Sequence, residues 1–134
     1  MNKDIKITKF AFLFGAIIDG FWAIVLAFPS LYVFITRSDD IEFNTQIRVI
    51  FIIASSLMFG WTFLLLWGYQ KPIERRTILL LTAFPVVFGI FLGTLISLSN
   101  GNTYAIIFLT KTALIIFVMI WGYIKAGRIA KSSK

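Results

Sequence analysis

The chain has 134 residues, of which 59% are hydrophobic and only 14% are charged. Soluble domains carry roughly 25% charged residues, so this composition indicates an integral membrane protein of a single domain. In a soluble chain the net charge of +7 would suggest a nucleic-acid partner, but basic cytoplasmic loops explain it here and we expect no nucleic acid.

The first apolar segment covers residues 10–36. It is longer than the apolar region of a signal peptide and lacks a convincing cleavage site, so we expect an uncleaved transmembrane helix. Pro29 lies late in this segment and should bend the helix or end its regular hydrogen bonding.

Three further spans follow the polar loop 37–46. The second is expected at residues 48–69. Residues 77–110 carry no charge and are too many for one span of roughly 20 residues, so the Asn100–Gly101 turn signal must divide them. The third and fourth helices are then expected at residues 76–98 and 103–124. The sequence therefore predicts an all-α, antiparallel bundle of four transmembrane helices formed by residues 1–134.

The distribution of lysine and arginine predicts the orientation of these helices. The amino terminus carries three, the turn at residues 70–76 three and the carboxyl-terminal tail four, against two in residues 37–48. Basic residues accumulate on the cytoplasmic side, so both termini are expected there, in a multi-pass protein of the cell membrane. Four aromatic residues form the matching interfacial belt: Trp67, Tyr69, Trp121 and Tyr123.

Small residues predict the faces on which the helices pack, because they let membrane helices approach closely. The first helix carries the stripe Gly15, Ala16, Gly20, Ala23 and Ala27, and the later helices carry Gly60, Gly68, Gly89 and Gly93. Gly89 and Gly93 form a GxxxG motif. We expect this motif to pack within the chain, with a dimer interface as the alternative.

Two ionisable residues fall inside predicted spans, namely Asp19 and Lys111. Counting 1.5 Å per residue from the inner surface puts Asp19 at ~15 Å and Lys111 at ~18–20 Å, a difference that a lysine side chain can bridge. We therefore expect an Asp19–Lys111 ion pair near the midplane. The alternative placement of Asp19 is the inner interface. Four hydroxyl residues share the predicted polar layer: Ser55, Ser56, Thr110 and Thr112.

Such a pair admits several roles. A buried ion pair can fix helix register with little net stabilisation. In a transporter, Asp19 would instead hold a proton or cation, with Lys111 as its internal counter-charge. The two residues could also act independently, with Lys111 extending toward lipid headgroups.

The block GWTFLLLWGYQKPIERRTILLLT, residues 60–82, is distinctive. It resembles a group of small prokaryotic four-helix membrane proteins with no known activity. The resemblance covers about a sixth of the chain and implies the same fold, but it implies no substrate or cofactor.

The chain offers little material for catalysis. It contains no cysteine and no histidine, which excludes thiol nucleophiles and thiolate or imidazole metal sites, and its six acids lie mostly in loops. We expect no catalytic residue, metal or cofactor, and hence no enzyme.

The leading interpretation is a structural or accessory membrane component, and the alternative is a subunit of an oligomeric transporter or channel. Expected partners are membrane lipids, a second copy or another membrane protein. Lipid headgroups would meet a basic cytoplasmic surface: Arg75, Arg76, Lys125, Arg128 and Lys131.

Overall fold

The computed structural model describes residues 3–39 and 41–132. Within these ranges the ordered elements are all helices, and four stretches are long and apolar enough to cross a membrane. These stretches are Lys3–Ala27, Thr45–Gln70, Thr77–Ser99 and Ala105–Ser132.

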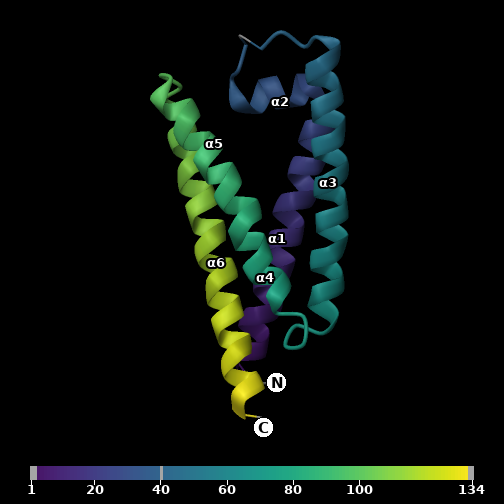
Figure 1. The fold of residues 1–134 in the computed structure, drawn as a ribbon, viewed down its shortest axis with the longest axis vertical. Helices are drawn as coiled ribbons and strands as arrows, with labels where there is room; N and C mark the ends of the chain where they lie inside the picture. The colour runs from purple at the N-terminus through teal and green to yellow at the C-terminus, as the bar shows by residue number, and fades with distance from the viewer. Residues whose placement is uncertain (1–2, 40, 133–134) are drawn as a thin grey trace.

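The first apolar segment forms two helices instead of one. α1 covers Lys3–Ala27 and the short α2 covers Pro29–Thr36. The break falls at Phe28, whose backbone is extended, because Pro29 has no N–H to continue the hydrogen bonding and starts a new helix instead. Figure 1 shows α2 lying across one end of the molecule, so α1 alone crosses between the two ends.

α3 covers Thr45–Gln70 and begins three residues before the expected start of the second span. Asn44 explains this start, because its side chain caps the helix by accepting a hydrogen bond from the Ile47 N–H at 2.9 Å. After Gln70 the chain turns through residues 71–76, where Lys71 and Glu74 form an exposed ion pair at 3.4 Å.

The third span is distorted around Pro85. It consists of α4 (Thr77–Leu81), the π-helical segment η1 (Thr82–Val87) and α5 (Phe88–Ser99). Phe84, which precedes Pro85, has non-helical backbone angles. The hydroxyl of the buried Thr82 donates to the Ile78 carbonyl at 2.7 Å and accepts the Trp61 indole N–H at 3.0 Å. The hydrogen bond from Trp61 connects the distorted segment η1 to α3.

The Asn100–Gly101 turn leads to the last helix. Gly101 has a φ of +91°, a conformation that a residue without Cβ adopts freely. α6 covers Ala105–Ser132 and therefore continues two turns beyond the expected end of the fourth span.

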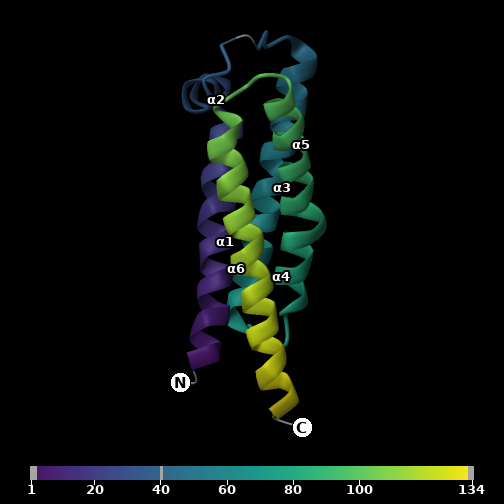
Figure 2. The same cartoon turned by 90° about the vertical axis from the view of Figure 1, so that its left-hand side faces the viewer.

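The helices form two pairs that meet at one end and spread apart at the other (Figure 1). α1 packs on α3, α5 packs on α6, and α1 also packs on α6. Both termini lie at the end where the pairs meet (Figures 1 and 2). The core lies there too, in a cluster that includes Ala11, Phe12, Leu65, Leu79 and Met119, each fully buried. The two pairs are thus joined at one end and do not pack against each other along their whole length.

The closest helix contacts form at glycines near this core. A Cβ placed on Gly68 would overlap the ring of Phe12, and one on Gly122 would lie 2.6 Å from the Ala11 Cβ. On Gly15 it would overlap the end of the Met119 side chain. Glycine therefore lets α1 approach both α3 and α6.

The other glycines that were predicted to lie at helix contacts do not form such close contacts with a neighbouring helix. Gly20 lies against the Thr62 side chain, 3.5 Å from where its Cβ would be. Gly60, Gly89 and Gly93 have nothing within 4 Å of that position, so the GxxxG motif does not pack within the chain as we expected. The reason is the separation of the two helix pairs, which leaves this part of α5 with α6 as its neighbour.

Candidate functional site

A cavity of about 600 Å³ separates the two helix pairs. It is mostly apolar, and every long helix contributes to its wall. Representative lining residues are Trp22 of α1, Met58 of α3, Ile90 of α5, Phe108 of α6 and Tyr32 of α2. Its volume lies within the roughly 300–1,000 Å³ of typical small-molecule sites.

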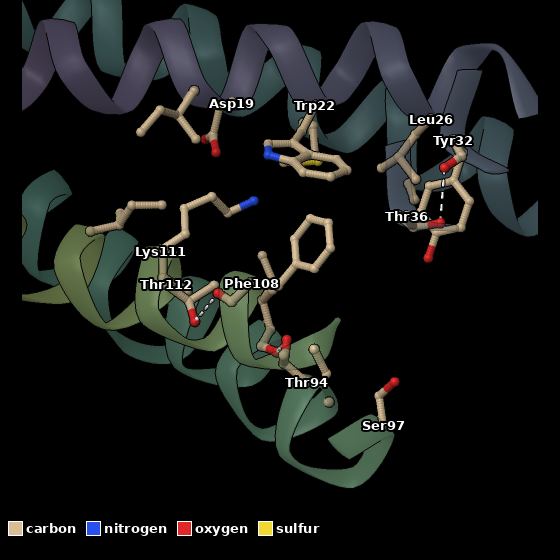
Figure 3. A pocket seen from close by; sticks show the side chains of 18 of the residues that line it. Asp19, Trp22, Leu26, Tyr32, Thr36, Thr94, Ser97, Phe108, Lys111 and Thr112 are labelled. Carbon is tan, nitrogen blue, oxygen red and sulfur yellow. Dashed lines mark hydrogen bonds between the residues drawn. The ribbon is translucent and has the colours of Figure 1, made fainter. Parts of the chain in front are cut away.

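Asp19 lies on the α1 wall of this cavity and is 8% exposed. Its Oδ2 atom is buried and has no hydrogen-bond partner among the described residues. Figure 3 shows the carboxylate directed toward the space between α1 and α6. A buried carboxylate oxygen without a partner is costly, and inside a membrane such a group usually marks a functional site.

Lys111 lies on the opposite, α6 wall of the same cavity. Its Nζ atom lies 3.9 Å from the centre of the Trp22 ring and 5.0 Å from that of Phe108. The expected Asp19–Lys111 ion pair is not formed: the ion pairs within 4.0 Å in the described part of the chain are Lys71–Glu74 and Lys125–Asp4. The Lys111 ammonium lies against the aromatic rings of Trp22 and Phe108 instead.

Of the four hydroxyl residues predicted to share a polar layer, only Thr112 lines the cavity. Its hydroxyl donates to the Phe108 and Leu109 carbonyls at 3.0 Å. Ser55 is buried away from the cavity and donates to the Ala23 carbonyl of α1 at 2.7 Å. Ser56 and Thr110 are exposed on the outer surface and bond back to their own helices.

Sequence reasoning did not assign the aromatic side chains of the site. Trp22 and Phe108 contact each other edge to face at 5.6 Å between ring centres and together surround the Lys111 ammonium. A spacing of three residues between Asp19 and Trp22, and again between Phe108 and Lys111, places each pair on one helix face. This spacing could have indicated from the sequence that an aromatic ring lies beside each of the two charged residues.

The predicted basic surface lies at the end where the pairs meet, and its members differ in their contacts. The Arg75 guanidinium stacks on the Trp67 ring at 3.5 Å and donates to the Trp67 carbonyl. Lys125 pairs with Asp4 at 3.1 Å. The remaining three line a separate hollow: Arg76, Arg128 and Lys131.

The chain matches no family model, no curated protein and no solved structure in the comparisons made with each.

Proposed function

We propose that this small multi-pass membrane protein is a non-enzymatic component that binds a small zwitterionic molecule with an apolar body. Four apolar helices support the membrane assignment. The observation that carries the proposal is the unpartnered, buried Oδ2 of Asp19 on a cavity that also holds Lys111.

The chemistry of the cavity decides the ligand class. Asp19 can accept hydrogen bonds from a ligand ammonium, and Lys111 can donate to a ligand carboxylate or phosphate. Opposite charges on facing walls disfavour a ligand with one charge, because one wall would then repel it. The apolar walls accommodate the remainder of the molecule, and an apolar α-amino acid is the simplest compound that meets these requirements.

Three related probes test the ligand class: L-phenylalanine, phenethylamine without the carboxylate, and 3-phenylpropionate without the amine. Binding to the detergent-purified protein is measured by calorimetry. We expect L-phenylalanine to bind about 10-fold or more tightly than either analogue, because each analogue loses a charge-assisted hydrogen bond. Equal binding of all three, or binding of none, contradicts the proposal.

Two variants test which protein charge contacts each charged group of the ligand. Asp19→Asn should lose the preference for L-phenylalanine over 3-phenylpropionate, and Lys111→Met the preference over phenethylamine. Glu74→Gln, which removes an acid from an exposed ion pair, is the matched control. If both cavity variants bind like the control while their thermal stability changes in a coupled way, the structural interpretation is correct instead.

The second candidate is a subunit of an oligomeric transporter or channel. It is favoured by the exposed Gly89, which has nothing within 4 Å of its Cβ position, whereas Gly93 lines the central cavity. Such a face suits close packing against a second copy. Because the chain has no cysteine, oxidative cross-linking of Gly89→Cys in membranes tests it directly, with the exposed Phe63→Cys on α3 as control. Cross-linking of both variants alike, or of neither, contradicts a specific interface.

Both termini are proposed to be cytoplasmic, in the cell membrane. This orientation rests on the excess of basic residues at the end where the termini lie.

A further inference from the structure

A second hollow, of about 390 Å³, lies far from the central cavity, at the end of the molecule that holds both termini. It is formed by the last turns of α6 and by the residue that precedes α4. Its lining is Arg76, Tyr123, Ile124, Gly127, Arg128 and Lys131.

The hollow concentrates positive charge that the described residues do not neutralise. Arg76, Arg128 and Lys131 come from two elements that are distant in sequence. Two acids lie at the same end of the molecule: Asp4 pairs with Lys125, and Glu74 pairs with Lys71. Arg76 also lies over the ring of Tyr123, 6.0 Å from its centre, which holds one cation at the edge of the hollow. Three converging cations favour an anion with several oxygen acceptors, such as a phosphate group.

The length of α6 indicates the source of that phosphate. Its 28 residues extend about 42 Å, whereas a hydrocarbon core is roughly 30 Å thick. With the expected fourth span, residues 103–124, inside this core, the last two turns, which carry Arg128 and Lys131, extend to the depth of the lipid headgroups. Ile124 borders the hollow and is 47% exposed, and Ile120, one turn toward the bilayer, is 39% exposed. An acyl chain attached to a phosphate in the hollow would meet this apolar face.

We propose that the hollow binds the phosphate group of an anionic phospholipid, with an acyl chain lying along Ile120 and Ile124. Gly127 forms the open base of the site, since nothing lies within 4 Å of where its Cβ would be. This lipid site is independent of the ligand proposed for the central cavity.

The test uses the detergent-purified protein and three probes: short-chain phosphatidylglycerol, the corresponding phosphatidylcholine, and inorganic phosphate. Binding is measured by calorimetry. We expect phosphatidylglycerol to bind at least 10-fold more tightly than phosphatidylcholine, because the choline cation faces three protein cations. Inorganic phosphate should bind at least 10-fold more weakly than phosphatidylglycerol, because it lacks the apolar contacts. If inorganic phosphate binds equally well, the site is a phosphate site without lipid recognition and the proposal is wrong.

Three variants locate the binding. Arg128→Gln combined with Lys131→Gln should weaken phosphatidylglycerol binding about 25-fold, which is about 5-fold for each cation. Lys3→Gln combined with Lys6→Gln removes the same charge from α1 outside the hollow and should leave most of the affinity. Gly127→Leu keeps every charge, fills the hollow and should abolish binding without loss of thermal stability. Equal losses in the two charge variants, or undiminished binding by Gly127→Leu, would show unspecific attraction to the surface.

Discussion

At the residue scale, the most constrained positions are those where α1 meets its neighbours. The fully buried Phe12 ring occupies the space above Gly68, and Ala11 is in contact with Gly122. Close-packed interiors tolerate added atoms poorly, because the surrounding side chains must leave their preferred rotamers. A larger residue at Gly68 or Gly122 should therefore destabilise the end of the molecule where the two helix pairs meet.

We predict that Gly68→Ala destabilises the protein by about 1–2 kcal/mol, since overpacking costs about 1–3 kcal/mol and the gain in helix propensity is about 1 kcal/mol or less. Gly60→Ala on the same helix is the control, because nothing lies within 4 Å of its Cβ position. It should leave stability unchanged or raise it slightly. Thermal unfolding in detergent measures both, and equal melting temperatures would contradict the packing.

Thr82→Val should destabilise the protein by about 1–3 kcal/mol, because it leaves the Trp61 N–H without its hydrogen-bond partner. The exposed Thr110, whose hydroxyl bonds only to the Ile106 carbonyl, gives the control Thr110→Val. Unfolding followed by tryptophan fluorescence distinguishes the two. An equal effect of both substitutions would mean that Trp61 has another partner.

At the scale of the elements, hydrogen bonds and aromatic contacts fix the rotation of each helix about its own axis. The hydroxyl of Ser55 anchors α3 to α1 through the Ala23 carbonyl, whereas the next residue, Ser56, is exposed. Hydropathy gives the length and depth of a span but leaves this rotation open. For this reason the sequence located Asp19, Lys111 and Thr112 at similar depth, yet it also included Ser56 and Thr110, which lie on the outer surface.

The adjacent serines provide a test of this rotation. Ser55→Ala should lower stability by about 0.5–2 kcal/mol, the range for hydrogen bonds between membrane helices. Ser56→Ala removes only a bond to the Ile52 carbonyl of its own helix and should have no measurable effect. If Ser56→Ala proves the more damaging of the two in thermal unfolding, α3 is rotated differently.

At the scale of the whole molecule, the presence of four long apolar helices was predictable from sequence because each depends on a local run of apolar residues, although the first was expected at residues 10–36 and covers Lys3–Ala27. The break at Pro29 and the turn at Gly101 were equally local. The separation of the two helix pairs was not predictable, since it depends on contacts between segments far apart in the chain. That separation leaves Gly89 and Gly93 with nothing within 4 Å of their Cβ positions, and it opens the cavity in which Lys111 contacts aromatic rings instead of Asp19.

The absence of cysteine allows the proposed topology to be mapped with single substitutions. Lys6→Cys and Ser132→Cys should react with an impermeant thiol reagent from the cytoplasmic side, and Asn100→Cys from the opposite side. All three positions are exposed. Reaction of Asn100→Cys from the same side as the termini would contradict the four-span topology. If each of the three variants reacted from the side opposite to the one expected, the orientation of the protein in the membrane would be reversed.

The spreading of the two helix pairs toward the end that carries α2 gives the molecule a wedge shape (Figure 1). In the proposed placement across a membrane, the protein would occupy more area in one leaflet than in the other, and a curved bilayer would accommodate it with less lipid deformation than a flat one. Partitioning between small and large vesicles of equal composition should favour the small ones, and equal partitioning would indicate that lipid entering between the pairs offsets the wedge.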